Sequence, residues 1–230
     1  MTTMRQRFAA FRDRVLRPQP RQSPPPTDEP GRVPRPTLVV GLGNPGGEYG
    51  NTRHNVGAWC VSLLARRHAA RLQRHGQVDR ATIEVRGHAL HLARPRAMVN
   101  ASGSPVAAEA RRLGLRPDQL LVVFDDLDLP VGQLRIRPHG GHGGHNGVRS
   151  LLDALGDNGF ARVRIGIDRP YDAGRPVRDP DRIAEWVLSS PGAEERARLD
   201  EAVALAAEAI ELATIEGVEA AMSAFNPSRE

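Results

Sequence analysis

The sequence contains no lysine and only one cysteine, and it is poor in aromatic residues. A single cysteine, Cys60, excludes a disulfide framework within the chain and fits a reducing compartment. No apolar run reaches the ~18 residues that a membrane-spanning helix needs, so no membrane association is expected. At 230 residues the chain can bury a full hydrophobic core. We therefore expect a cytoplasmic protein whose core is held together by packing alone.

The positive charge of the chain is all arginine and is unevenly distributed. Residues 1–36 hold 8 arginines against 3 acidic residues, and residues 37–180 hold 20 against 13, whereas residues 181–230 hold 4 against 11. A basic body suits a polyanionic partner such as a nucleic acid. A plain bias toward arginine would give the same numbers, so the charge does not decide between the two explanations.

Proline divides the chain into two parts. Residues 1–36 hold 8 of the 19 prolines, including Pro24-Pro25-Pro26, and show no pattern of a packed element. Such a composition is typical of extended or disordered segments. We predict a disordered Pro/Arg-rich arm over residues 1–36 and one folded domain over residues 37–230.

Strand and helix patterns alternate from Thr37 onward. Unbroken apolar runs such as Leu120–Phe124 predict strands covered on both faces, and apolar residues spaced by three and four predict helices. We predict strands over residues 38–42, 81–86, 88–94, 120–124, 133–137 and 162–167, and helices over residues 55–71, 105–113 and 148–155. The strands on either side of Gly87 should form a hairpin. This order predicts a single α/β domain, a twisted mixed β-sheet flanked by helices in three layers.

One long helix is predicted at the end of the chain. Ser190 is placed to cap it, Pro191 suits its first position, and Glu194 and Glu195 suit its first turn. One apolar stripe follows, formed by Leu199, Val203, Ala206, Ile210 and Ala213. We expect this stripe to pack on the sheet.

The segment Gly41-Leu42-Gly43-Asn44-Pro45-Gly46 matches the G-x-G-x-x-G pattern of dinucleotide-binding sites. That pattern binds pyrophosphate only where its third glycine opens a helix. Here residues 47–54 are polar and rich in turn formers, and no acidic residue follows at the expected distance. The glycines more plausibly form a tight turn that brings Asn44 and His54 together, although a nicotinamide or flavin enzyme stays open as an alternative.

Polar residues gather in short segments where a scaffold would not need them. These segments supply Asn44, His54 and Asn55, Asn100, Asp125, Asp126 and Asp128, and His145 and Asn146. Asp125 ends an apolar central strand, which is where α/β sheets place their ligands. A histidine beside such an aspartate can act as a general base, and asparagines can donate to a carbonyl oxygen or bind water.

The candidate nucleophile is water, because no serine or cysteine lies in a nucleophile motif. A metal site is an alternative, since His139, His142 and His145 recur every three residues and the acids of FDDLD resemble Mg²⁺ ligands. Glycines between the histidines leave such ligands poorly organised, and no complementary Cys or His set is present. We predict neither a metal nor another cofactor.

Five segments together resemble the motifs of bacterial peptidyl-tRNA hydrolases. They are GLGNPGGEYGNTRHNVG, RPRAMVNASG, FDDLDLPVGQLRIR, GGHGGHNGVRSLLDALG and FARVRIGIDRP, in this order, and the resemblance extends from Thr37 to the C-terminal helix. That family cleaves the ester between a peptide and the 3′ end of its tRNA, which frees tRNA after abortive translation. The resemblance implies peptidyl-tRNA as the partner, and we expect a monomer.

The resemblance also implies roles for single residues. His54 would be the general base that activates water, and Asp125 would orient it and stabilise its charged form. Asn44 and Asn100 would hold the backbone of the peptide or of the tRNA 3′ end near the ester. Asn146 would bind the water or the developing oxyanion.

Further positions of the family fall on the walls of the substrate cleft. Tyr49, Asn55 and His145 would line that cleft. Val99 stands where the family usually has methionine, which shortens an apolar wall and affects peptide preference rather than catalysis.

A basic pair of the family, which grips a tRNA phosphate away from the ester, falls on Arg137 and Arg164. The first of these is usually lysine. Arginine keeps the charge and adds a planar fork, so phosphate binding should persist.

Relatives in plant organelles resemble the enzyme but act as RNA-binding splicing factors. A non-catalytic RNA-binding protein is therefore the alternative reading. Loss of the base or of its aspartate would favour it, and this sequence keeps both His54 and Asp125.

Overall fold

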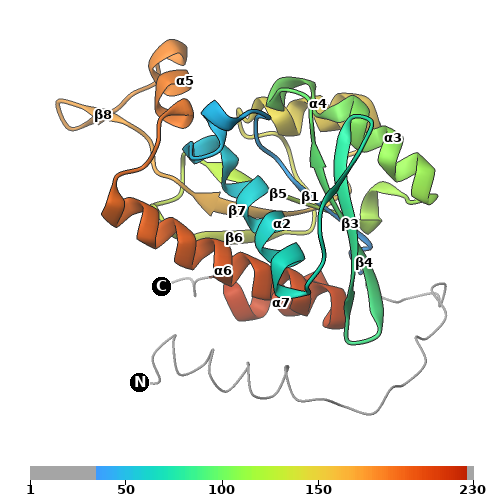
Figure 1. Ribbon diagram of the computed structural model, residues 1–230. Coiled ribbons are helices and arrows are strands. Elements are labelled where there is room, and N and C mark those ends of the chain that lie inside the picture. The colour runs from blue at the N-terminus through green and yellow to red at the C-terminus, as the bar shows by residue number, and fades with distance from the viewer. Residues whose placement is uncertain (1–34, 227–230) are drawn as a thin grey trace, which may run out of the picture.

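The computed structural model describes residues 35–226, in which a seven-stranded mixed sheet lies between two layers of helices (Figure 1). The strand order is β2-β3-β4-β1-β5-β7-β6. The strands are β1 Leu38–Gly41, β2 Gln73–His75, β3 Val78–Val85, β4 His88–Pro95, β5 Leu120–Asp126, β6 Leu134–Arg137 and β7 Ala161–Gly166. The central strands β4, β1, β5 and β7 are parallel, and β2, β3 and β6 pair antiparallel at the two edges. The predicted N-terminal arm lies outside the described residues except for Arg35 and Pro36.

Two separate apolar clusters attach the helices to the sheet. The larger cluster packs α2 Val56–Arg67, α6 Ala193–Glu216 and α7 Val218–Phe225 on one face. The smaller packs α3 Gly103–Leu113 and α4 Asn146–Leu155 on the other. The predicted three-layer α/β domain is thereby confirmed, and none of the described helices is both long and apolar enough to span a bilayer.

Strand β5 shows why the sheet is covered on both faces. All seven of its residues are buried, and alternate side chains enter different clusters because successive side chains of a strand point to opposite faces. Leu121 and Val123 belong to the cluster under α2 and α6, and Val122 and Phe124 to the cluster under α3 and α4. Asp125 and Asp126 complete the strand at its carboxyl end, where the apolar run stops.

The predicted hairpin is present. β3 and β4 pair antiparallel from Val78↔Pro95 to Val85↔His88, and Arg86 and Gly87 form the turn with positive φ angles of 49° and 82°. The short edge strand β2 is an addition that the sequence analysis did not predict.

The C-terminal prediction was partly wrong. The long helix begins after Gly192 rather than at Ser190, and Gly217, with φ 96°, separates α6 from a second helix α7. The Ser190 carbonyl instead accepts a hydrogen bond from Arg53, which keeps this linker outside the helix. Glu194 and Glu195 do lie in the first turn of α6. The predicted stripe is buried at each of its positions, Leu199, Val203, Ala206, Ile210 and Ala213.

A helix and a small hairpin were not predicted. They are α5 Pro180–Leu188 and the strands β8 Tyr171–Asp172 and β9 Arg175–Pro176, which together project at the upper left of Figure 1. The signal for α5 was present, because Asp179 caps the backbone N–H of Arg182 at 3.0 Å and Pro180 occupies the first turn. Helix α5 has no buried residue and packs beside the one-turn helix η2 Arg53–Asn55.

The glycine-rich turn after β1 does not open a helix. Gly46 has φ 109° and leads into a single 3-10 turn, η1 Gly47–Tyr49, and α2 begins only at Val56. Gly43 is needed because a Cβ there would lie 2.9 Å from the Asn55 side-chain oxygen. The glycines therefore allow close packing of the two polar segments, and the dinucleotide site has no helix N-terminus to use.

Candidate active site

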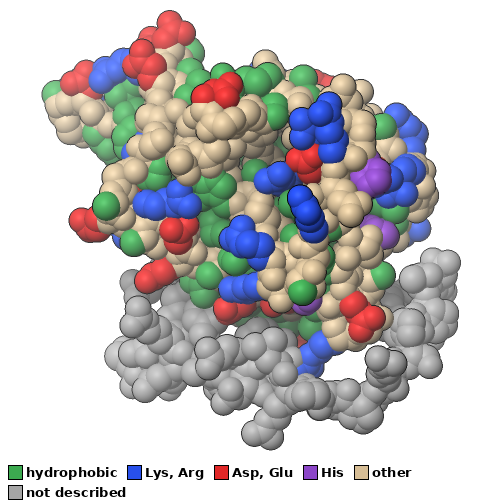
Figure 2. All heavy atoms as spheres, viewed as in Figure 1, with side chains coloured by type: hydrophobic (Ala, Val, Ile, Leu, Met, Phe, Trp, Pro, Cys, Tyr) green, Lys and Arg blue, Asp and Glu red, His purple; other side chains and the backbone are tan. Residues whose placement is uncertain are grey.

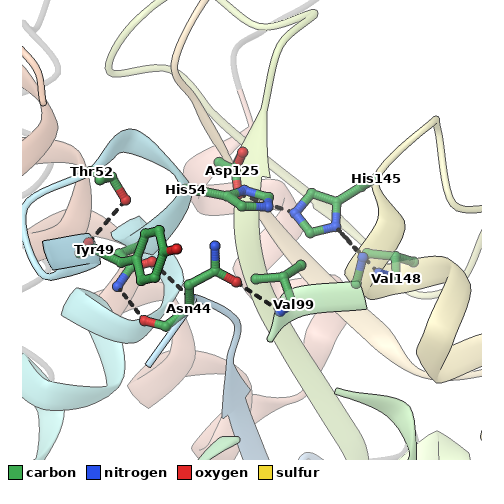
Figure 3. A network of polar contacts seen from close by, with 10 residues as sticks. Asn44, Tyr49, Thr52, His54, Val99, Asp125, His145 and Val148 are labelled. Atoms are coloured by element: carbon green, nitrogen blue, oxygen red, sulfur yellow. Dashed lines mark hydrogen bonds and ion pairs between the residues drawn. The ribbon is translucent and has the colours of Figure 1, made fainter. Parts of the chain in front are cut away.

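Five polar segments converge at the carboxyl ends of β1 and β5. Asn44 follows β1, His54 lies in η2, Asp125 is near the end of β5, and His145 caps α4. The fifth segment is η3 Val99–Ala101. In Figure 3 the rings of His54 and His145 both point at Asp125, and Asn44 points at Val99.

Asp125 is the centre of the site. It is 3% exposed, and its Oδ1 accepts hydrogen bonds from His54 Nδ1 at 2.8 Å and from His145 Nε2 at 3.1 Å. Burial disfavours the carboxylate, but the charges and hydrogen bonds of the two histidines outweigh it and hold the pKa of Asp125 well below its usual range. Asp125 therefore carries a negative charge inside the protein, directed at both rings.

The backbone of α4 fixes the proton on His145. Its Nδ1 faces the N–H groups of Gly147 at 3.1 Å and Val148 at 3.3 Å, so this nitrogen accepts and carries no proton. The single proton of the neutral ring then lies on Nε2, which donates to Asp125. Both nitrogens of His145 are therefore engaged in hydrogen bonds to protein groups.

His54 has the opposite arrangement. Its Nδ1 donates to Asp125, which leaves Nε2 unprotonated and without a hydrogen-bond partner among residues 35–226. Burial by itself would lower the pKa of His54, but the charge of Asp125 and its hydrogen bond raise it above 6.5. The side chain is 14% exposed. A partly accessible imidazole with a free Nε2 and a buried carboxylate behind it has the geometry of an oriented general base.

Asn44 is held in place by two neighbouring segments. Its side-chain Oδ1 accepts the N–H of Val99 at 2.8 Å, and its backbone N–H and C=O bond the side chain of Asn55 at 2.8 and 2.9 Å. The Nδ2 amide of Asn44 has no partner in the described part of the chain, so it is oriented and free to donate. Asn55 and Val99 are both buried, and Asn55 uses both polar side-chain atoms on Asn44.

The other candidate residues lie at the surface beside this cluster. Asn100 and Asn146 are exposed and line a groove of about 660 Å³ between α3 and α4. Tyr49 is half-buried in η1, where its carbonyl accepts two hydrogen bonds from Thr52, just before His54.

Arg53 is a site feature that the sequence analysis missed. Its guanidinium binds both carboxylate oxygens of Glu195 at 2.7 and 2.6 Å, donates to Ser189 Oγ at 2.5 Å, and stacks 3.7 Å from the centre of the Trp186 ring. The side chain is only 6% exposed. Glu195 is 142 residues further along the chain, so no local pattern announced the pair. Arg53 therefore ties the segment that carries His54 to α5 and α6.

The two predicted phosphate contacts lie on neighbouring strands, Arg137 on the edge strand β6 and Arg164 on β7 beside it. Arg137 pairs across the sheet with Arg162, and Arg164 pairs with Arg135, so four arginines share one face of β6 and β7. Like charges directly opposite each other destabilise a sheet, and a polyanion would relieve that cost. Arg164 is ion-paired with Asp126, whereas Arg137 is half-buried and makes no ion pair within residues 35–226.

Arg162 binds the glycine-rich segment of residues 140–144, before α4, and does not face solvent. It is 2% exposed and donates to the carbonyl of Gly141 at 2.7 Å. Burial, together with the charge of Arg164, lowers the pKa of Arg162 to about 10. Arg135 and Arg162 were missed by the sequence analysis, although the two-residue spacing within each strand could have placed them beside Arg137 and Arg164.

The surroundings of the three central side chains argue against a metal site, and those of Cys60 argue against a reactive thiol. Ligand atoms of His54, Asp125 and His145 lie within 4.8 Å of one another, but both histidines direct N–H groups at the carboxylate, and the α4 amides prevent His145 from reversing its tautomer. This set does not suit a metal ion. Burial raises the pKa of Cys60 to about 12, which leaves that thiol unreactive.

Basic and acidic side chains are unevenly distributed on the visible face of the molecule. In Figure 2, basic side chains extend over the middle and right of the visible face, and acidic side chains are prominent at the corner formed by α5. The visible face thus combines a basic body with an acidic projection.

Comparison with known proteins gives a consistent result. A family model described as peptidyl-tRNA hydrolase matches residues 38–230. A peptidyl-tRNA hydrolase of Nocardia farcinica is 45% identical over 190 residues, which covers 82% of this chain and 95% of the relative. The corresponding protein of Alkalilimnicola ehrlichii is 42% identical over 188 residues, covering 80% and 90%. A crystal structure of peptidyl-tRNA hydrolase from Acinetobacter baumannii matches with a TM-score of 0.78 at 32% identity, covering 86% of this chain and 98% of that one.

Proposed function

Because the chain belongs to the peptidyl-tRNA hydrolase family, we propose that it hydrolyses the ester between a peptide and the 3′ end of a tRNA. The observation that supports this most directly is the pair of His54 and Asp125, with the second ring nitrogen of His54 left free. Water is the nucleophile, since the only cysteine is buried and protonated.

The proposed reaction begins with proton transfer from water to His54 Nε2. The water oxygen attacks the ester carbonyl carbon, and Asp125 stabilises the imidazolium that forms. The tetrahedral intermediate then collapses with cleavage of the bond to the ribose oxygen, which takes the proton back from Nε2. A general base of this kind contributes roughly 10²–10⁴-fold to the rate.

The asparagines supply donors to the substrate in this proposal. Asn44 is suited to the carbonyl oxygen or oxyanion, because its oxygen is bound to Val99 and its amide is left to donate. Asn100 and Asn146 are exposed at the groove and contact the substrate there, with Asn146 near the water or the oxyanion. Tyr49 and His145 complete the walls of the cleft. Val99 acts through its backbone N–H, which holds the Asn44 side chain, and Asn55 acts through the Asn44 backbone, which its side chain binds.

We place the tRNA along the arginines of β6 and β7. Arg137 provides a cation that makes no ion pair within residues 35–226, and Arg164 contributes once it exchanges Asp126 for a phosphate or shares both. A tRNA substrate places the protein with the translation machinery in the cytoplasm.

An RNA-binding protein without catalysis would need the arginines but not the oriented base. The preserved geometry of His54 and Asp125 favours the enzyme over that alternative.

The decisive experiment measures peptide release from an N-blocked aminoacyl-tRNA, with the unblocked aminoacyl-tRNA and the His54→Ala variant as controls and a chelator present. Cleavage of the blocked substrate alone, lost in the variant and unaffected by the chelator, is the expected result. Tight tRNA binding without cleavage by the unaltered protein would instead support the RNA-binding alternative.

A further inference from the structure

A second cavity lies at the edge of the sheet opposite to β6 and β7, over β2, β3, β4 and the end of α3. Its volume is about 410 Å³, and its polar lining includes Arg71, Arg80, Thr82, His91, Glu109 and Arg112. None of the residues around Asp125 lines it, so it is separate from the active site. Figure 2 shows histidine and basic side chains gathered at the right, where α3, β3 and β4 lie in Figure 1.

The register of the edge strands brings polar side chains to the face that lines this cavity. Gln73 of β2 is opposite Arg80 of β3, and Thr82 of β3 is opposite His91 of β4. Arg80 and Thr82 are two positions apart, so all four side chains leave the sheet on the same side. The end of α3 completes the lining.

Glu109 orients two of the arginines in the cavity. It is 5% exposed and accepts hydrogen bonds from Arg80 Nη1 at 3.1 Å and from Arg112 Nε and Nη2 at 2.9 and 2.7 Å. The hydrogen bond from Arg112 and the charges of both arginines outweigh burial and hold the pKa of Glu109 below its usual range. The carboxylate thus fixes both guanidinium groups. Arg80 Nε and Nη2 and Arg112 Nη1 stay without a partner in the described chain.

The cavity carries an excess of positive charge. Three arginines line it, and its only acidic residue is Glu109. The third arginine, Arg71, is exposed and makes no hydrogen bond or ion pair with any residue that the structure describes. A bound anion with up to two negative charges would therefore be balanced by this lining.

His91 reports the same excess from inside the cavity. Its Nδ1 lies 2.9 Å from Thr82 Oγ1, and its Nε2 has no hydrogen-bond partner within residues 35–226. Burial lowers the pKa of His91, and the charges of Arg112 and Arg80 lower it further against the opposing charge of Glu109. The ring is therefore neutral near pH 7, and its free nitrogen is available to a ligand.

We propose that this cavity binds a phosphate group. A guanidinium fork matches a phosphate in shape and charge. A phosphate monoester carries about 1.5 to 2 negative charges at neutral pH, which equals the excess of the lining. The inference does not depend on the proposed hydrolase function. The same chemistry is offered by a phosphodiester of an RNA backbone and by a free nucleotide, and the experiment separates these two sources.

The first test titrates the protein with inorganic phosphate, with sodium chloride at equal ionic strength as the reference, and follows the ring resonances of His91 by NMR. Phosphate should shift these resonances in a saturable manner. Arg71→Gln should weaken phosphate binding roughly tenfold, as expected for a charged hydrogen bond. Because Arg71 has no described partner, this variant keeps the fold intact. The matched control is Arg111→Gln, an exposed arginine of α3 outside the cavity, which should bind phosphate unchanged.

No saturable shift below about 10 mM phosphate would overturn the proposal, as would equal phosphate affinity in Arg71→Gln and Arg111→Gln. Titrations with AMP and with tRNA then identify the source of the phosphate. If the source is RNA, Arg71→Gln weakens tRNA binding and makes its salt dependence shallower by roughly one phosphate contact. If it is a free nucleotide, only the affinity for AMP falls. Unchanged affinity for both ligands would overturn the proposal, because neither source then uses the cavity.

Discussion

His54 and His145 bond the same oxygen of Asp125 and differ in what their second ring nitrogen meets. In His145 that nitrogen accepts two backbone N–H groups of α4, and the ring is held as a helix cap. In His54 it has no hydrogen-bond partner among the described residues.

This difference teaches that an aspartate does not make a base of every histidine beside it. A general base needs an unprotonated nitrogen whose lone pair is not already used in a hydrogen bond and lies within reach of the substrate. Of the two histidines, only His54 has such a nitrogen. His145 instead helps to keep Asp125 ionised, and it therefore affects His54 only through Asp125.

The largest effect is expected when the histidine with the free ring nitrogen, His54, is removed. His54→Ala should reduce kcat by about 10³-fold or more, since general base catalysis supplies roughly 10²–10⁴-fold and the oriented water is lost as well. The affinity for tRNA should stay within about twofold. Single-turnover cleavage and tRNA binding measure the two quantities, with His75→Ala at the distant edge strand β2 as the control. Retained turnover in His54→Ala would contradict the mechanism.

Replacement of Asp125, which accepts hydrogen bonds from both histidines, tests how its charge affects the pKa of His54. Asp125→Asn should lower kcat by about 10²-fold and also move the acidic limb of the pH profile. In the unaltered protein the rate rises with pH as His54 loses its proton, with a midpoint above 6.5, because Asp125 raises the pKa of His54. Without that charge, burial dominates and lowers the pKa of His54, so the limb moves to lower pH. A limb that stays in place would mean that another group controls it.

Loss of the Arg53–Glu195 ion pair, which anchors the segment that carries His54, should affect the rate less and the stability more. Arg53→Met leaves Glu195 largely buried without its partner, and removal of one partner from a buried ion pair costs about 3 kcal/mol. Below the lowered melting temperature we expect kcat to fall about tenfold with little change in KM, because η2 is no longer held against α5 and α6.

The neighbouring Arg196→Met, which removes an exposed arginine stacked on Trp59, is the control for Arg53→Met. Arg53→Met/Glu195→Gln should recover part of the stability, since no unpaired charge stays behind. If the double variant regains stability and full kcat together, Arg53 does not position His54.

The smallest effect should follow from changing His145 in two steps. Asn at position 145 can still cap α4 but cannot reach Asp125, so His145→Asn should keep its melting temperature and lose less than about tenfold in kcat. His145→Ala loses the cap as well and should be less stable by ~1 kcal/mol. In both variants the acidic limb should stay above 6.5, because Asp125 still faces His54. Loss of activity as severe as that of His54→Ala would remove the distinction between the two rings.

Elements with strong local patterns were predictable. The unbroken apolar run became the buried strand β5, and the strands around Gly87 became the expected hairpin. The predicted final helix failed at both ends. Before it, Arg53 from a distant segment binds the linker, and after it Gly217, a local signal that the sequence analysis overlooked, ends α6. Helix α5 was missed although Ile183, Trp186 and Val187 recur at helical spacing after the cap residue Asp179.

By itself, the sequence determined most of the strands of the main sheet, the helices that cover it and the short segments that hold polar residues, because apolar spacing and turn residues act over a few positions. The tertiary structure alone decided what those polar residues do. Asp125 meets His54 from 71 residues away, Arg53 meets Glu195 from 142 residues away, and the difference between the two histidines depends on where the backbone of α4 begins. Such contacts are fixed by the packing of the layers, and no local pattern of residues encodes them.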